Sequence, residues 1–330
     1  MSDILVRATR LDKTYTSGPA LGLFGEKRSV RSVSGIDLDV RRGEVIGLIG
    51  ESGSGKSTLG RLLLGLIEPT AGTVDFDGKP LSGSSPAELR ALRRRMQMIF
   101  QDPYSSLDPR RTVGDQIADG LVIHGLMPKA AQGAEVDRLL MQVGLKAEHA
   151  GRYPNAFSGG QRQRIGIARA LATKPDFLVA DEPVSALDVS VQAQVLALLA
   201  NLKSSLGLSM VFISHDLSAV RHLCDRIVVL YLGKVMEQGP TAEVYAHPKH
   251  PYTRALMSAA PTLQNAKSRV REILIGDPPS PANPPSGCVF RTRCRMAAEA
   301  CAKTVPPLDT VGPAHQAACL FPMEPRASFL

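Results

Sequence analysis

The sequence predicts an α/β fold in which a mixed or parallel central sheet is combined with a helical subdomain and a small C-terminal cysteine-bearing tail. Short β-branched runs alternate with helical patterns up to about residue 240, as in layered α/β domains. Three nearly continuous apolar runs lead into polar residues: EVIGLIG (44–50), DFLVAD (176–181) and MVFISHD (210–216). Such runs are typical of central parallel strands that are buried on both faces and carry chemistry at their carboxyl ends.

The remaining elements follow from local patterns. RIVVLYLGKVMEQG (226–239) contains two apolar runs around Gly233 and predicts a hairpin. The region of about 102–170 is richer in helix formers and predicts the helical subdomain. Beyond residue 240 the chain reads AHPKHPYTRAL and then GDPPSPANPPSG, where the proline density excludes regular helix or strand and predicts a linker. We therefore expect one domain over residues 1–240 and an extension over residues 241–330.

The composition is that of a globular protein. The 330 residues are 44% apolar, enough to bury the cores of two or three domains. Because no run approaches about 18 apolar residues and the first residues mix acid and base, we expect neither a membrane span nor an export signal. The net charge of +8 would suit nucleic acid, an anionic membrane surface or phosphate ligands. The cluster of Arg90, Arg93, Arg94 and Arg95 favours the solvated face of a helix over contact with lipid head groups.

One stretch carries a complete phosphate-binding pattern. GLIGESGSGKST fits G-x-x-x-x-G-K-[ST] and lies between an apolar strand and the helical pattern STLGRLLLGL. The glycines let backbone N–H groups turn toward a phosphate, and the helix N-terminus adds its positive end. Lys56 would reach the β and γ phosphates of ATP, and Ser57 would ligate Mg²⁺. The loop comprises Gly50, Glu51, Ser52, Gly53, Ser54, Gly55, Lys56, Ser57 and Thr58.

DFLVADEP supplies two carboxylates at the end of another apolar run. Asp181 can hold the Mg²⁺ shell, and Glu182 can orient and deprotonate an attacking water. One carboxylate would suffice for metal binding, so the adjacent pair argues for hydrolysis rather than nucleotide binding alone.

Between these two motifs stands FSGGQRQR (157–164), and with it the sequence resembles the ATPase subunits of ATP-binding-cassette transporters. The family signature is usually written L-S-G-G-Q, and Phe157 replaces its leucine here. The resemblance covers about residues 3–260 and implies a P-loop NTPase cassette. It implies that the signature loop contacts the γ-phosphate of ATP held by another subunit. That loop comprises Ser158, Gly159, Gly160 and Gln161.

The resemblance assigns four further residues. Gln101 matches the glutamine loop that contacts Mg²⁺ and links the site to the permease, and Asp188 in SALD matches the loop that faces the partner subunit. His215 matches the switch histidine that contacts the γ-phosphate. Taken singly, these are ordinary features of a loop, a helix cap and a strand end, but they occur in the family order. An aromatic residue should stack on adenine, and Tyr15 is the natural candidate, with Phe24 as a rival.

Two stretches resemble the dipeptide and oligopeptide importer branch: MIFQDPYSSLDPRRTVGDQI and the tail from HPKHPYTRAL to the last cysteine. This resemblance implies uptake of peptides, or of other small solutes such as nickel chelates or glutathione-like molecules. It implies a second, related ATPase, giving a heterodimer or alternatively a homodimer. It further implies two membrane-spanning permeases, an extracytoplasmic solute-binding protein, and a peripheral position on the cytoplasmic face of the plasma (inner) membrane.

The five cysteines divide into two groups. Cys224 stands alone in an apolar stretch and predicts a buried structural thiol. The tail has the pattern C-x5-C-x6-C-x17-C, which lacks the C-x2-C pairs of common zinc sites, while four thiolates also suit a 4Fe-4S cluster. Members of the importer branch can carry such a cluster at matching positions. The cluster is favoured, zinc is second, and free or disulfide-paired thiols stay open for Cys288, Cys294, Cys301 and Cys319.

Other cassette ATPases act in DNA repair, in translation or as regulators. Repair types insert a long coiled coil between the glutamine loop and the signature, whereas 56 residues lie between Gln101 and Ser158. Translation types carry two cassettes in one chain, and this chain has one. A regulator without turnover is opposed by Glu182 and His215. We therefore expect a transport ATPase without a nucleic-acid partner, one that holds ATP alone but does not complete a hydrolytic site alone.

Overall fold

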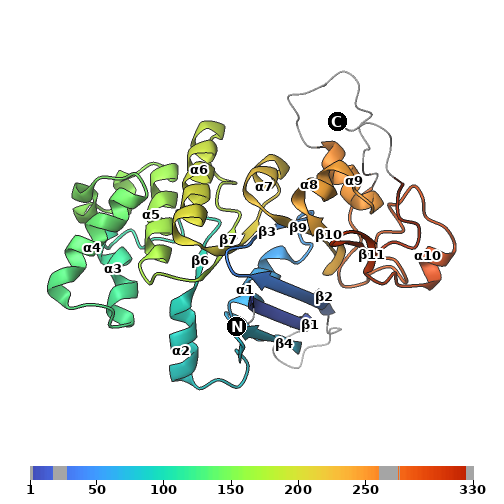
Figure 1. Cartoon of the computed structure of the whole chain (residues 1–330), viewed down its shortest axis with the longest axis horizontal. Coiled ribbons are helices and arrows are strands. Elements are labelled where there is room, and N and C mark those ends of the chain that lie inside the picture. The colour runs from blue at the N-terminus through green and yellow to red at the C-terminus, as the bar shows by residue number, and fades with distance from the viewer. Residues whose placement is uncertain (1–2, 18–27, 260–273, 275, 325–330) are drawn as a thin grey trace.

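The computed structural model describes residues 3–17, 28–259, 274 and 276–324. Its centre is an eight-stranded sheet in the order β11-β12-β10-β9-β3-β8-β7-β6 (Figure 1). The five strands from β9 to β6 in this order are parallel to one another. They are β3 (Val45–Ile49), β6 (Met96–Ile99), β7 (Phe177–Asp181), β8 (Ser209–Ile213) and β9 (Arg226–Tyr231). The predicted central parallel strands are therefore confirmed, and β3, β7 and β8 are buried along their whole length.

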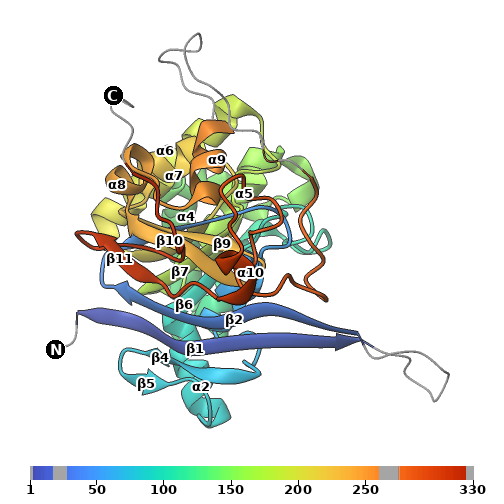
Figure 2. The same ribbon diagram turned by 90° about the vertical axis from the view of Figure 1, so that its right-hand side faces the viewer.

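A second, antiparallel sheet of four strands lies along one face of the first (Figure 2). Its order is β2-β1-β4-β5. The strands are β1 (Ile4–Ser17), β2 (Arg28–Arg41), β4 (Ala71–Phe76) and β5 (Lys79–Pro80). α1 (Lys56–Leu63) packs against both sheets, and its buried leucines share one apolar core with them. This arrangement fixes the loop that precedes α1.

The opposite face of the central sheet is covered by helices. Along β3, Ile46 and Leu48 face the core around α1, while Val45 and Ile49 face the second core, as strand alternation requires. That second core is covered by α6 (Val189–Leu206) and α7 (Leu217–Leu223). The sheet is thus buried on both faces, which explains why its strands read as continuous apolar runs.

The helical subdomain lies at one end of the molecule (Figure 1). It contains α3 (Val113–Ile123), α4 (Lys129–Gln142), the 3₁₀ turns η1 (Ala147–Gly151) and η2 (Pro154–Ala156), and α5 (Gly159–Leu171). The helices contact one another, and α5 also contacts β6 and α6 of the central layers. The predicted helical subdomain is confirmed, and α5 joins it to the central sheet.

The arginine cluster lies on α2 (Pro86–Arg95), a helix that begins with a capping box between Ser85 and Glu88. Leu92 is the buried residue of this helix, and Arg90, Arg93 and Arg94 are exposed. The prediction of a solvated helix face is therefore confirmed. Arg95 at the helix end instead forms ion pairs with Asp77 and Asp176.

The predicted hairpin is formed by β9 and β10 (Lys234–Pro240). Its two turn residues, Leu232 and Gly233, both have positive φ angles, of 45° and 76°. A two-residue turn with this conformation matches the twist of the flanking strands. Cys224, just before β9, is buried as predicted, and burial raises the pKa of its thiol.

The C-terminal region departs from the predicted linker. α8 (Thr241–Ala246), α9 (Pro251–Ala259), α10 (Ala300–Lys303), β11 (Asp309–Gly312) and β12 (His315–Ala317) are regular elements. The prediction holds for residues 276–287, which form neither helix nor strand, but it is wrong for AHPKHPYTRAL. The reason is position: Pro251 opens α9, and a helix needs no N–H donor in its first turn.

β12 pairs with β10, so this region extends the central sheet. The carboxylate of Glu237 on β10 is fully buried and accepts hydrogen bonds from the backbone N–H groups of Lys249 and His250. It also lies 2.7 Å from Nε2 of His315 on β12. One buried acidic group thus ties together β10, β12 and the segment before α9. Within the described residues, no helix is both long and apolar enough to cross a bilayer.

Candidate nucleotide-binding site

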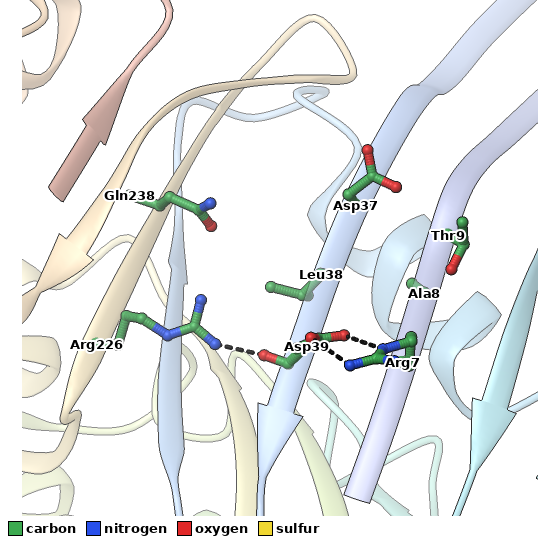
Figure 3. Close-up of a pocket in the computed structure, with 8 residues that line it drawn as sticks. All are labelled: Arg7, Ala8, Thr9, Asp37, Leu38, Asp39, Arg226 and Gln238. Carbon is green, nitrogen blue, oxygen red and sulfur yellow. Dashed lines mark hydrogen bonds and ion pairs between the residues drawn. The ribbon is translucent and has the colours of Figure 1, made fainter. Parts of the chain in front are cut away.

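A hollow of about 400 Å³ lies where β1 and β2 meet β9 and β10 (Figure 3). The charged side chains in its wall already have partners. Arg7 pairs with Asp39 at 2.9 Å, and Arg226 donates to Glu44 and to the carbonyl oxygen of Asp39. Asp37 accepts the backbone N–H of Arg10. None of the residues predicted for the nucleotide lines this hollow, and we place the site elsewhere.

The phosphate-binding loop joins the end of β3 to the start of α1. A Cβ atom at Gly50 would lie 2.2 Å from the carbonyl oxygen of Leu230, and one at Gly55 would lie 2.1 Å from that of Ser32. The φ angles at these positions are +150° and +102°. Because both obstacles are backbone atoms, glycine is required at both positions. The loop is therefore held between β2 and the β9–β10 hairpin.

Lys56 lies inside this loop. Its side chain is 6% exposed, and Nζ donates to the carbonyl oxygens of Gly50 at 2.8 Å and Glu51 at 2.9 Å. Burial lowers the pKa of Lys56, although the carboxylates of Glu182, Asp181 and Glu51 oppose this. A phosphate would supply a nearer counter-charge, so Lys56 is placed to move from these carbonyl groups to a phosphate.

Ser57 and Asp181 form a pair suited to Mg²⁺. The Ser57 hydroxyl donates to Oδ1 of Asp181 at 2.9 Å. Asp181 is 3% exposed, and burial raises the pKa of its carboxyl group. A hydroxyl and one carboxylate, completed by phosphate oxygens and water, are the ligands Mg²⁺ prefers in nucleotide sites. The ion would also supply the positive charge that the buried carboxylate lacks.

The three predicted catalytic residues meet at one oxygen atom. Gln101 Nε2 donates to Oε2 of Glu182 at 3.0 Å, and Nδ1 of His215 lies 3.4 Å from the same oxygen. Glu182 also has a φ angle of +45°, unusual for a residue with a side chain. Strained backbone of this kind is concentrated at functional sites, where the surrounding structure holds it.

The signature loop begins α5. Ser158 is the N-cap, and its hydroxyl accepts the N–H of Gln161, while the Gln161 side chain accepts the N–H of Ser158. This reciprocal capping box is visible in the spacing S-x-x-Q, a signal that our sequence analysis did not use. A Cβ atom at Gly160 would lie 2.2 Å from Cγ1 of Val191 on α6. The tyrosine ring of Tyr104, in the glutamine loop, lies next to Gly159. The signature, glutamine and Asp188 loops thus pack together.

Asp188 and the following residue face outward. Asp188 stands at the N-cap of α6 without a side-chain capping bond, and it is exposed. Val189 is 82% exposed. An exposed acid beside an exposed apolar side chain fits a contact surface better than a helix cap.

The adenine contact is only partly placed. Tyr15 lies on β1 opposite Val30 of β2, two residues from Ser32, whose carbonyl group packs against Gly55. The Tyr15 side chain is 43% exposed, with Lys13 Nζ 5.3 Å from the ring centroid. Its ring is therefore available beside the phosphate loop. Phe24, the rival candidate, lies outside the described residues.

Two contacts on the phosphate loop were not predicted. Arg293 forms an ion pair with Glu51, and the Tyr252 hydroxyl accepts the backbone N–H of Glu51. Both residues belong to the C-terminal region. Since they are more than 200 positions from Glu51 in the sequence, no local pattern could have indicated them.

The tail cysteines line one small cavity whose wall also contains Phe290, Leu320 and Phe321. These cysteines are Cys288, Cys294, Cys301 and Cys319, and all are free thiols. Burial raises the pKa of Cys288 and Cys294, and it raises that of Cys319 to about 11. Among the residues that the structure describes, no three His, Cys, Asp or Glu side chains are grouped so that they could hold a single metal ion.

Comparison with known families and proteins gives consistent matches. Residues 33–185 match the family described as ABC transporter, and residues 236–301 match the family described as oligopeptide/dipeptide transporter, C-terminal region. A protein of Brucella ovis named as a putative peptide import ATP-binding protein is 56% identical over 88% of this chain and 92% of its own length. The oligopeptide transport ATP-binding protein AppF of Bacillus subtilis is 48% identical over 90% of this chain and 92% of its own length.

Solved structures match the larger part of the fold. A dimeric ATP-binding cassette in a post-hydrolysis state, bound to ADP and Pi, has a TM-score of 0.64 and 30% identity. The match covers 72% of this chain and 99% of that one. The cbiO1 protein of Clostridium perfringens, part of an ABC transporter complex, also has a TM-score of 0.64, with 29% identity over 74% of this chain and 92% of its own.

Proposed function

This chain belongs to the ATP-binding-cassette family of transporter ATPases, and from that premise we propose that it is the ATP-hydrolysing subunit of a membrane importer for dipeptides or oligopeptides. One observation carries the proposal: a complete phosphate loop and the converging Gln101, Glu182 and His215 occur in a chain that also has an importer-type C-terminal region. Similar proteins are named for putative peptide import and for oligopeptide transport.

The geometry supports hydrolysis as follows. The loop of residues 50–58 would hold the phosphates of ATP, and Lys56 would turn from the two carbonyl groups to neutralise them. Ser57 and Asp181, together with Gln101, would hold Mg²⁺. Glu182 orients the attacking water and accepts its proton, while Gln101 and His215 keep the carboxylate in place.

A second ATPase completes the site. Asp188 and Val189 are exposed, and the capping hydrogen bonds of the signature loop join Ser158 and Gln161 of the loop itself. Both observations support an interface that closes over ATP. A solved cassette of the same fold is described as a dimer with ADP and Pi. The partner is a related chain in a heterodimer, with a homodimer as the alternative.

The glutamine loop faces the membrane components. Phe100 and Tyr104, on either side of Gln101, are exposed, as is Tyr153 in the helical subdomain. The exposed aromatic residues around Gln101 support docking of the permease subunits on the surface formed by the glutamine loop and the helical subdomain. Two permeases and an extracytoplasmic solute-binding protein complete the importer, and this chain lies on the cytoplasmic face of the plasma (inner) membrane.

The cysteine cavity holds a 4Fe-4S cluster in this proposal. Four free cysteines line one small cavity, and four thiolates are the donors that such a cluster requires. Zinc held by the same four thiols is the second candidate. The cluster would act as a structural staple for the tail.

Metal analysis tests the cluster directly. Protein purified without oxygen should contain about four iron and four sulfide per chain, with visible absorbance that is lost in Cys288→Ala. Zinc at one per chain, or four thiols that react with a thiol reagent in the metal-free native protein as isolated, would contradict it.

Reconstitution tests the function. The chain is co-expressed with its second ATPase and two permeases, placed in liposomes, and supplied with the solute-binding protein. We expect phosphate release and labelled-peptide uptake that both depend on a peptide-loaded binding protein, with Lys56→Ala inactive. Stimulation by nickel chelates or glutathione, without stimulation by peptides, would favour the other solutes. Hydrolysis indifferent to the permeases would contradict an import role.

A further inference from the structure

The C-terminal region contacts Glu51, the residue that follows Gly50 in the phosphate loop. Arg293 donates two parallel hydrogen bonds to Glu51, with Nη1 2.6 Å from Oε2 and Nη2 3.0 Å from Oε1. The Arg293 side chain is 5% exposed and that of Glu51 is 25% exposed. A bidentate, buried pair of this kind fixes both side chains in one geometry.

A second contact holds the backbone of the same residue. The Tyr252 hydroxyl on α9 accepts the N–H of Glu51 at 2.8 Å. Tyr252 packs against Tyr231 and Phe290, with ring centroids 4.8 Å and 5.2 Å away, and Arg293 Nη1 lies 3.3 Å from the Tyr231 hydroxyl. The support is thus a cluster of three packed aromatic rings.

The ion pair of Arg293 with Glu51 also neutralises a negative charge in the phosphate loop. Glu51 places a carboxylate in a loop whose ligand is a triphosphate, and two anions so close together repel each other. Arg293 cancels that charge from the side of the C-terminal region. The Glu51 carbonyl group is held by Lys56 Nζ, which the nucleotide would draw away, so the contacts from Arg293 and Tyr252 are the ones that persist.

We propose that Arg293 and Tyr252 are positioning residues for ATP: the C-terminal region completes the nucleotide site by holding Glu51 in place and neutralising it. This inference rests on the proposed binding of ATP to residues 50–58. It gives the C-terminal region a part in nucleotide affinity, in addition to any part in holding a cluster.

The test is a charge cycle in the full chain assembled with its partners. Arg293→Met keeps the length of the side chain but leaves Glu51 unpaired. We expect the Kd for a fluorescent ATP analogue and the KM for ATP to rise about tenfold, with kcat within about twofold, as expected for one unscreened charge near the phosphates. Glu51→Gln combined with Arg293→Met removes both charges and should return the Kd to within about threefold of wild type.

Two further variants separate positioning from general damage. Tyr252→Phe keeps the ring but loses the acceptor for the Glu51 N–H, and it should raise the Kd about threefold, the loss of one hydrogen bond. Arg291→Met, two positions from Arg293, removes an arginine that bonds Ser286 instead, and it should leave the Kd unchanged. All variants are checked by thermal melting.

The outcomes are distinct. Unchanged affinity in Arg293→Met, or a double variant no better than the single one, overturns the inference while leaving ATP binding by the wild type intact. Failure of the wild type itself to bind ATP would instead overturn the proposed function. A rise in KM matched by an equal fall in kcat, seen in Arg291→Met as well as in Arg293→Met, would indicate general structural damage and would also overturn the inference.

Discussion

The side-chain amide of Gln101 donates to the carboxylate of Glu182, with Nε2 3.0 Å from Oε2, although the residues are 81 positions apart. The sheet explains the contact. Gln101 follows β6, Glu182 follows β7 and His215 follows β8, and these three strands are parallel neighbours. Since the carboxyl ends of neighbouring parallel strands lie at one edge, the three side chains reach a single carboxylate. Any movement of the glutamine loop therefore changes the hold on Glu182.

Replacing Glu182 by Gln should separate binding from hydrolysis. The amide cannot accept a proton from water, but the phosphate loop and the Ser57–Asp181 pair are untouched. We expect ATP affinity within about threefold of wild type and phosphate release at least about 100-fold slower, with a closed dimer accumulating. Phosphate release and size-exclusion chromatography with ATP measure both. Turnover near the wild-type rate in the assembled transporter would contradict the assignment of Glu182.

Asp181 should cost stability in the protein without nucleotide. Burial raises the pKa of Asp181 in the folded chain, so folding favours its protonated carboxyl over the carboxylate. The stability that the protonated carboxyl contributes is lost as the pH rises through this folded-state pKa. Asp181→Asn keeps the contact with Ser57 without the charge, and we expect the melting temperature at pH 8 to rise by about 2 °C or more. The gain should shrink as pH falls toward about 4, where aspartate is protonated in the unfolded chain as well.

The same variant should lose its response to Mg²⁺ and ATP, because the proposed ligand of Mg²⁺ is gone. Melting curves with and without both, at about pH 4 and pH 8, provide the measurement. A variant that melts below the wild type at pH 8, or that gains as much from Mg²⁺ and ATP, would contradict the role of Asp181.

The strands that carry the site could be predicted from sequence because both of their faces are buried. β3, β7 and β8 read as unbroken apolar runs, and the polar residues that follow each run mark the edge where chemistry occurs. The phosphate loop could be predicted because its glycines stand at fixed positions where a Cβ atom would collide with backbone atoms, as at Gly50 and Gly55. These features depend on residues close together in the chain.

The features that sequence analysis missed depend on contacts between distant segments. The pairing of Arg293 with Glu51 joins positions 242 apart and leaves no local pattern. The addition of β12 to β10 likewise depends on the buried Glu237 and on where the chain returns. α9 was missed for a different reason, since prolines were weighed by number and not by the position of Pro251 in a first helical turn.

Gly160 should be intolerant of a side chain because of Val191. A Cβ atom at residue 160 would lie 2.2 Å from Cγ1 of Val191, whose branched side chain cannot turn aside easily. Gly160→Ala should therefore destabilise the chain by about 1–3 kcal/mol and displace the signature loop. Denaturant unfolding and ATP hydrolysis by the assembled transporter measure the two effects.

Removing the obstacle provides the control. Gly160→Ala combined with Val191→Ala takes away the methyl groups that collide, and we expect at least half of the lost stability to return. If the double variant is no more stable than Gly160→Ala, the collision with Val191 is not the cause.

Ser158 should matter to the partner's ATP and not to ATP on its own chain. Ser158→Ala removes the hydroxyl at the start of α5, and it also removes an N-cap, which costs about 1 kcal/mol. Thr112→Ala is the matched control, because Thr112 caps α3 in the same subdomain by accepting the N–H of Asp115 and has no place in the nucleotide site.

Both variants, Ser158→Ala and Thr112→Ala, should lose similar stability. Only Ser158→Ala should slow hydrolysis by the assembled transporter, by about tenfold or more, while ATP binding to the isolated chain stays unchanged in both. If Thr112→Ala slows hydrolysis as much, or if the isolated wild-type chain hydrolyses ATP as fast as the complex, the signature loop does not act on another subunit.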